Sequence, residues 1–335
     1  MRRMLWAATL ADSCWCGCFS RHDDHSASAS RPVPLLLYTH GRTNATLSSP
    51  CNLIYIKVTK CASSTTGGVI RRIAAANDLS GVHSETWLTA EPGVWANHGK
   101  LADKWRSFQQ LRQRSFLMTM VRLPAPRCLS GFYHFQVSRR RVEPNAANKI
   151  GWLSSCSDYI FQYIQPPTPS SDRQSGRQWT PRELVSNVYS FVGVAERYDE
   201  SMVLLSWMLR VPLSDILYLK SKDSTAGGMD TSTGTAFVPH TSAEKEPEVV
   251  KLSISSAGFQ ANNSRDLELH ILANAELDRK WHMNRKELDA RLATFKRMLA
   301  KAAQLCSNAP PCYWNDNGCG YKCLDQHFAH KSSST

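Results

Sequence analysis

Hydrophobic positions in this chain fall into short continuous runs and longer stretches with helical spacing. Apolar runs at residues 53–58, 115–121 and 189–195 predict strands, and the middle run is suited to a strand buried on both faces. Further stretches repeat their apolar residues at helical spacing and predict helices: residues 65–77, 101–114, 199–210, 267–281 and 284–306. Residues 221–248 lack any such period and are rich in Ser, Thr, Gly and acidic residues, so we expect a disordered insertion there.

The first predicted strand opens the stretch around which the chain is organised. It is followed by a loop of small and hydroxyl residues that contains Lys60, and then by the helix predicted over residues 65–77. In this order of elements, backbone N–H groups and a helix N-terminus converge on a phosphate, and Gly67 and Gly68 let backbone approach a ligand closely. The Walker A pattern is absent. The stretch is therefore either an anion-binding loop or a buried strand with a polar turn.

The second predicted strand ends in a turn that two prolines make rigid. Arg122 stands at the carboxyl edge of this strand, and Ser130 lies one or two turns into the helical pattern that follows. From these positions both side chains can point at one phosphate from two sides. A surface ion pair is the alternative role for the arginine.

Composition indicates that the binding partner is acidic, but it does not identify which kind of acidic partner. The chain has 335 residues, of which 42% are hydrophobic and 20% charged, and this excludes wholesale disorder. The formal net charge of +12 implies an acidic partner. A nucleotide, an acidic glycan, a nucleic acid and an anionic membrane surface all qualify.

Both loops resemble the phosphate motifs of one enzyme family. Residues 57–65, KVTKCASST, resemble the loop LKTHKTASST of Golgi carbohydrate sulfotransferases, in particular the galactose 3-O-sulfotransferase family. Residues 122–133, RLPAPRCLSGFY, resemble the second motif of that family, LRDPVxRxxSxxxY, and residues 191–209 resemble its VGLTERFDESLVLL block. The resemblance covers residues 51–281 with gaps. It implies an α/β, P-loop-like sulfotransferase fold, with a central and mostly parallel sheet flanked by helices, plus a disulfide-rich C-terminal tail.

The resemblance also implies a co-substrate, 3′-phosphoadenosine 5′-phosphosulfate. Arg122 and Ser130 would grip its 3′-phosphate. The chain departs from the family pattern at Thr59, Cys61 and Leu123, where the family has His, Thr and Asp. The 5′-phosphosulfate end would be held by the first loop, through Lys57, Lys60, Cys61, Ala62, Ser63, Ser64 and Thr65.

Sulfuryl transfer needs a cation at the bridging oxygen and a base for the acceptor hydroxyl. Lys60 is the expected cation. Histidine suits the base near neutral pH, and the histidines between the two motifs are His83 and His98. His98 is the expected base, because Asn97 and His98 resemble the NH segment that precedes the second motif in the family. No metal is required by this chemistry, and the sequence has no evident set of metal ligands.

The acceptor implied by the family is a galactose-containing glycolipid or glycoprotein, and a polysaccharide would present similar hydroxyls. The aromatic residues of the segment 139–169 either form a platform for this sugar or belong to the core. They are Trp152, Tyr159, Phe161 and Tyr163. Nucleic acid is not an expected partner, and the sequence does not indicate an oligomeric state.

The termini suggest passage through the secretory pathway. Residues 1–50 are expected to be a leader or degenerate signal-anchor followed by a stem, residues 51–306 the sulfotransferase domain, and residues 307–335 a cysteine-rich tail. Four cysteines near the C-terminus lack the C-x-x-C spacing of zinc knuckles, so two disulfides are favoured over a metal site: Cys306, Cys312, Cys319 and Cys323. Two glycosylation sequons begin at Asn44 and Asn262. The expected location is the Golgi lumen, as a type II membrane protein or a soluble form of one.

Three other functions compete with this hypothesis. A nucleotide-dependent kinase on a related scaffold is disfavoured, because the Walker A glycines and an evident Mg²⁺-binding carboxylate are missing. A non-catalytic basic protein that binds glycan or nucleic acid is weakly supported, since only residues 139–141 form a tight basic cluster. The third is an inactive, degenerate sulfotransferase.

Overall fold

The computed structural model describes residues 52–84, 92–168, 178–221, 227–230, 234–309 and 317–328. The predicted leader and stem, the sequon at Asn44, Cys312 and the last residues of the tail lie outside this range. Within the described residues, no helix combines the length and the apolar composition needed to cross a membrane.

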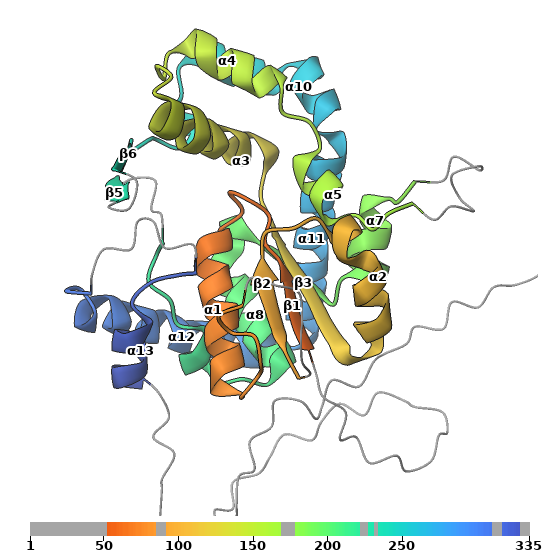
Figure 1. The fold of residues 1–335 in the computed structure, drawn as a ribbon, viewed down its shortest axis with the longest axis vertical. Helices are drawn as coiled ribbons and strands as arrows, with labels where there is room; N and C mark the ends of the chain where they lie inside the picture. The colour runs from red at the N-terminus through yellow and green to blue at the C-terminus, as the bar shows by residue number, and fades with distance from the viewer. Residues whose placement is uncertain are drawn as a thin grey trace, which may run out of the picture.

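A four-stranded parallel sheet lies at the centre of the fold (Figure 1). Its strands are β1 (Asn52–Ile56), β2 (Val94–Asn97), β3 (Ser115–Val121) and β4 (Phe191–Val194), in the order β2-β1-β3-β4. All residues of β1, β3 and β4 are buried, as expected for a parallel sheet with helices on its faces. The prediction for β3 matches at both ends, and those for β1 and β4 match at their cores. β2 was not predicted.

Helices flank the sheet, so the expected α/β class is confirmed, and the finer assignment to a sulfotransferase fold stays a proposal. The α-helices are α1 (Ser63–Ala76), α2 (Leu101–Leu111), α3 (Pro124–Gly131), α4 (Ala146–Ser154), α5 (Tyr159–Ile164), α7 (Pro181–Glu183), α8 (Tyr198–Leu209), α9 (Glu248–Ser255), α10 (Ala257–Asn262), α11 (Ser264–Met283), α12 (Arg285–Leu305) and α13 (Tyr321–Phe328). Short 3₁₀ or π turns adjoin them, of which η2 (Phe132–Ser138), η4 (Ala195–Arg197) and η6 (Ala243–Lys245) matter below.

The main core forms where the apolar stripes of these helices meet the sheet. Val69, Ile70 and Ile73 of α1 are completely buried, and α1 packs against β1 and β2. At the opposite end of the sheet, α8 and α11 pack against the edge strand β4, and α12 packs on α8. Each fully buried aliphatic side chain contributes roughly 1.5–3 kcal/mol. This burial fixes the sheet and therefore the positions at which its strands end.

A smaller second layer lies beyond the sheet, where α3, α4 and α10 form the upper part of the molecule in Figure 1. It has its own apolar cluster, to which Leu129, Leu153, Val250 and Phe259 contribute buried side chains. Asn145 caps α4 by accepting the N–H of Asn148. Since α3 and η2 run on as one helical stretch from the end of β3, this layer is attached directly to the sheet edge.

The segment predicted as a disordered insertion contains regular structure, so that prediction is wrong for its described residues. Strands β5 (Gly228–Asp230) and β6 (Thr235–Phe237) pair antiparallel, and η6 follows. Phe237 is buried and its ring stacks on His134 of η2, with 5.3 Å between ring centroids. The Val238 N–H donates to the Ser138 hydroxyl. These contacts with η2 order a segment whose composition alone favours disorder.

The C-terminal tail is linked by disulfide to the main body, which confirms the expected disulfide chemistry there. Cys306 pairs with Cys323, and Cys319 is also in a disulfide, whose partner lies outside the described residues. The tail contacts α1, where Arg72 forms an ion pair with Asp325 of α13 at 2.6 Å. A side-chain carbon at Gly68 would collide with the Tyr321 hydroxyl, so this glycine makes room for the tail.

Candidate functional site

The topology of the sheet brings the predicted site residues to one edge. From β1 the chain crosses to β2 on one side and then to β3 on the other, so the order reverses between β1 and β3. In open parallel sheets, ligands bind outside the carboxyl ends of the strands at such a reversal. His98 follows β2, Lys60 follows β1 and Arg122 follows β3. All three therefore start from the same edge.

The loop after β1 has a backbone that few residues adopt. Lys60 and Ala62 both have positive φ angles, 66° and 56°. Ala62 is the N-cap of α1 and has no side chain that could accept a hydrogen bond, so the first helix turn begins without a side-chain cap. The amides at such a helix start have no acceptor within the helix and, with the helix dipole, favour an anion.

Tyr159 connects this loop to the helix after β3. Its hydroxyl lies 2.8 Å from the Thr59 hydroxyl, and the Arg127 guanidinium lies over its ring at 4.5 Å from the centroid. In addition, Arg122 donates from Nη1 to the Lys60 carbonyl at 3.1 Å. The two loops are thus joined by the Arg122 side chain and through the Tyr159 side chain.

The N-terminus of α5, which carries Tyr159, is held by a buried carboxylate of α11. Asp266 accepts the N–H groups of Ile160 and Phe161 at 3.0 and 2.7 Å. Burial raises the pKa of Asp266 to about 6, although the two N–H groups oppose the shift. Asp158, which precedes α5, in turn accepts hydrogen bonds from the backbone N–H groups of Arg265 and Asp266 on α11.

The turn after β3 is held by a carboxylate from the turn after β4. Glu196 accepts the Leu123 N–H at 3.0 Å and contacts His270 at 3.2 Å. Burial alone would raise the pKa of Glu196, but the hydrogen bonds from His270 and the Leu123 N–H outweigh it and lower the pKa. Leu123 stands where the sulfotransferase motif described above has Asp. Here Glu196 of η4 supplies a carboxylate to this turn.

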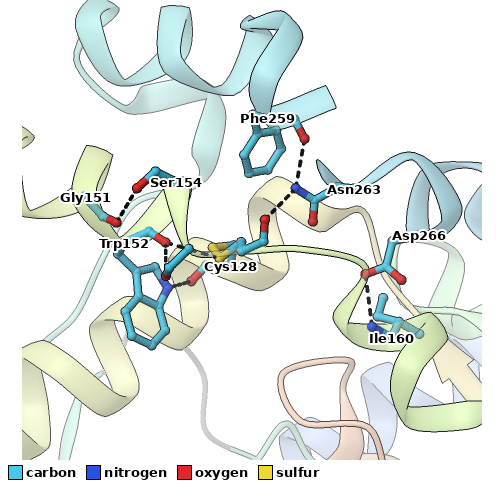
Figure 2. Close-up of a disulfide and its surroundings, with 10 residues drawn as sticks. Cys128, Gly151, Trp152, Ser154, Ile160, Phe259, Asn263 and Asp266 are labelled. Carbon is cyan, nitrogen blue, oxygen red and sulfur yellow. Dashed lines mark hydrogen bonds between the residues drawn. A yellow bond between two sulfur atoms is a disulfide. The ribbon is translucent and has the colours of Figure 1, made fainter. Parts of the chain in front are cut away.

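The Cys128–Cys156 disulfide fixes α3 to the end of α4 (Figure 2). The Trp152 indole donates to the Cys128 carbonyl at 2.9 Å, and the Asn263 amide donates to the Cys156 carbonyl at 3.1 Å. Cys128 is two residues from Ser130 and one from Arg127. The position of the predicted phosphate-binding serine is therefore tied covalently to the second layer.

A cleft of about 440 Å³ opens at this edge of the sheet. It brings together most of the residues expected to hold the donor or to act on it. Its lining comprises Thr59, Lys60, Ala62, Ser63, Ser64, His98, Arg122, Ser130, His134, Phe135, Arg139 and Ser221. Among the described residues, the lining contains cationic side chains and no carboxylate, which suits an anionic ligand.

His98 lies at the cleft in a defined tautomer. Its Nδ1 is 2.7 Å from the Lys57 carbonyl oxygen, which can only accept, so Nδ1 carries the proton in the neutral ring. The proton-accepting nitrogen is then Nε2. His83, the other histidine between the two loops, is exposed and does not line the cleft.

Three residues expected to contact the donor do not line the cleft. Lys57 is buried, and its side chain runs past Gly67, whose missing Cβ leaves room for it. Cys61 lies in the main core, where burial raises the pKa of its thiol to about 12, and its N–H donates to the Val58 carbonyl. Thr65 is buried and its hydroxyl accepts the Ser221 N–H. Lys57 directly follows β1, and Cys61 lies between Lys60 and Ala62, whose positive φ angles turn the chain there.

The two glycines expected to admit a ligand are also used by the protein itself. Gly67 makes room for the Lys57 side chain and Gly68 for Tyr321, so neither faces the cleft. Among the aromatic residues considered as a sugar platform, Phe161 and Tyr163 are buried in the main core. Trp152 packs against Phe132 and Tyr159 joins the two loops.

Sequence reasoning missed His134, Phe135 and Arg139 as cleft residues. His134 and Phe135 lie on η2, which continues α3 beyond Ser130, and Arg139 directly follows η2. Helical spacing was a usable signal for His134, which follows Ser130 by four positions. It could not place Arg139, because η2 has a π-helical turn that shifts the faces of the helix.

A scan against protein-family models finds no match to this chain, and a comparison with curated proteins finds no significant relative.

Proposed function

We propose that this protein is a sulfotransferase that moves a sulfuryl group from 3′-phosphoadenosine 5′-phosphosulfate to a glycan hydroxyl. The observation that carries the proposal is that two loops whose residue types suit anions meet at one cleft. Lys60 and the start of α1 lie on one side of the strand-order reversal, and Arg122 and Ser130 lie on the other. Two separate anion sites suit a donor with phosphate at both ends.

In this proposal the loop after β1 holds the 5′-phosphosulfate. The amides of Ser63 and Ser64 and the hydroxyls of both residues face the donor from the first turn of α1. Lys60 stabilises the negative charge that grows on the bridging oxygen as the bond from sulfur to that oxygen breaks. Arg122 and Ser130 hold the 3′-phosphate, and the leaving group is 3′-phosphoadenosine 5′-phosphate.

His98 is the proposed base. As the acceptor oxygen forms its bond to sulfur, the hydroxyl proton moves to Nε2, and the Nδ1–H bond to the Lys57 carbonyl keeps the ring oriented. The histidine and the lysine approach the donor from the ends of adjacent strands, β2 and β1. This arrangement suits an in-line displacement.

The proposed setting is the Golgi lumen, with a glycan acceptor. The disulfides Cys128–Cys156 and Cys306–Cys323 support an oxidising compartment. Asn262, the first residue of the second sequon, is exposed at the end of α10. A galactose-containing glycolipid or glycoprotein is the first acceptor to test.

The decisive experiment incubates the protein with sulfate-labelled donor and a panel of galactosyl, uronosyl and hexosaminyl acceptors. We expect label transfer to at least one acceptor and saturable binding of 3′-phosphoadenosine 5′-phosphate. His98→Ala should lower kcat by about 10²–10⁴-fold and leave nucleotide binding nearly unchanged. His83→Ala is the matched control and should behave like wild type. If the wild-type protein shows no label transfer and no nucleotide binding, the proposal is refuted.

A further inference from the structure

The cleft extends beyond the groups that the proposed donor uses. Ser130 lies on α3, and Arg139 follows η2 on the same helical stretch, nine positions later. At 1.5 Å per residue this separation is about 13.5 Å along the helix. Both residues line the cleft, which therefore follows this helix from Ser130 to a far end at Arg139.

The far end combines an aromatic ring with a guanidinium group. The Arg139 guanidinium lies over the Phe135 ring, 5.4 Å from its centroid, and both side chains line the cleft with His134. An aromatic face can pack against the C–H face of a sugar ring. A planar guanidinium beside it can bind a carboxylate or sulfate in bidentate fashion, which an uncharged hydroxyl cannot match.

The surrounding charge favours the same kind of ligand. Lys60 and Arg122 line the cleft together with Arg139, and none of its described lining residues carries a carboxylate. A neutral sugar would gain nothing from this concentration of positive charge, whereas an anionic one would be attracted to it and oriented by it.

We infer that this end of the cleft, formed by His134, Phe135 and Arg139, binds an anionic substituent of the acceptor glycan. The substituent is the carboxylate of a uronic acid or a sulfate group already on the chain. The inference rests on the proposed sulfotransferase function and narrows its acceptor from glycans in general to acidic glycans.

The test compares Arg139→Gln with Arg140→Gln, an exposed neighbour that does not line the cleft. Three matched acceptors are used: a neutral galactoside oligosaccharide, the same backbone with a uronic acid, and the same backbone with one sulfate. We expect the wild-type protein to have a lower KM for one or both acidic acceptors than for the neutral one. Arg139→Gln should raise that KM about tenfold, with little change in kcat or in the KM of the neutral acceptor. Arg140→Gln should change each value by less than about twofold.

Comparing the two acidic acceptors identifies the anionic group that the site binds. A site for carboxylate gives the lower KM for the uronic acid acceptor, and a site for sulfate gives the lower KM for the sulfated acceptor. Equal KM values for neutral and acidic acceptors in the wild-type protein would overturn the inference. So would a loss of affinity for 3′-phosphoadenosine 5′-phosphate in Arg139→Gln, because Arg139 would then belong to the donor site.

A direct binding measurement tests this inference independently of the proposed sulfotransferase function on which it rests. Calorimetric titration of the wild-type protein and of Arg139→Gln with the uronic acid and sulfated oligosaccharides needs no donor and no turnover. Nucleotide binding without preference for acidic glycans would contradict only the inference. Absence of nucleotide binding would contradict the proposed function, and a glycan affinity that depends on Arg139 would still support an acidic-glycan site.

Discussion

The turns after β1 and β3 reach the same cleft, but different kinds of contact hold them. The first is set largely by its own backbone: positive φ angles at Lys60 and Ala62 place the start of α1, and the buried Cys61 anchors the loop in the main core. Tyr159 and Arg122 contact this loop in addition. The second depends on residues far away in the sequence, through the Glu196 carboxylate and the Cys128–Cys156 disulfide. The first loop should therefore survive perturbations that disorder the second.

The largest expected effect comes from removing the cation of the first loop. Lys60→Ala should lower kcat for sulfuryl transfer by about 10³-fold, because a charge that acts only in the transition state is lost. Arg122→Ala should instead weaken donor binding by about tenfold or more, because in the proposed function Arg122 holds the 3′-phosphate in ground and transition states alike. Steady-state kinetics with both variants would measure this split. A raised KM without loss of kcat in Lys60→Ala would contradict the division of roles.

Breaking the disulfide of the second layer should separate the two loops. Cys128→Ala combined with Cys156→Ala removes a cross-link over 28 residues and should cost about 3 kcal/mol in the free energy of unfolding. Donor affinity should fall several-fold, because Ser130 and Arg127 lie on the released helix. Chemical denaturation and nucleotide titration would measure these effects.

The matched control removes the other disulfide, Cys306–Cys323, which closes a 17-residue separation away from the cleft. It should lower stability by a similar amount without changing donor affinity. Equal losses of affinity in both double variants would show that the second turn has no special dependence on its cross-link.

A pH effect on stability should arise at α5, which carries Tyr159 between the two loops. The pKa of Asp266 is raised by burial to about 6, so the folded state holds its proton more tightly than the unfolded chain does. Its contribution to stability is full below the unfolded pKa near 4 and is lost as pH rises through about 6. The loss is on the order of 2–3 kcal/mol. Denaturant unfolding between pH 4 and 7.5 should show this fall in wild type, and Asp266→Asn should lack it.

The smallest expected effect concerns the residue at which the first loop departs from the sulfotransferase pattern. Cys61→Ala should lower stability by about 1 kcal/mol, because a small buried side chain is truncated. Donor affinity and kcat should stay within about twofold, since the Cys61 side chain lies in the core and not at the cleft. Thermal unfolding and nucleotide titration would test this. A tenfold loss of nucleotide affinity would show that Cys61 contributes to the binding site after all.

The parts of the fold that were predictable are those with strong local patterns. The continuous apolar run of β3 and the helical stripes of α8, α11 and α12 predicted elements close to the observed ones. Strand β2 was missed because its four residues, VWAN, do not belong to a longer apolar run like the one that contains β4. The β5–β6 hairpin was missed because its order comes from packing on η2, through Phe237 and Val238, and not from its own composition.

The candidate site was predictable in its residue types and less so in their directions. Lys60, Ser63, Ser64, His98, Arg122 and Ser130 do meet at one cleft. That Lys57 and Cys61 turn inward depends on the backbone angles of the loop, which sequence patterns do not encode residue by residue. The Cys128–Cys156 pairing and the Glu196 contact could not be foreseen, because both join elements whose proximity is decided only by tertiary packing.

The Cys128–Cys156 disulfide also has a consequence for how this protein should be prepared. A reducing bacterial cytosol would yield chains whose sheet and first loop are formed while the helix that carries Ser130 lacks its covalent anchor. Such material should be soluble and well folded by circular dichroism, yet poor at retaining nucleotide. Expression with export to an oxidising compartment, or refolding with a glutathione redox buffer, is therefore the appropriate route to material for every assay above.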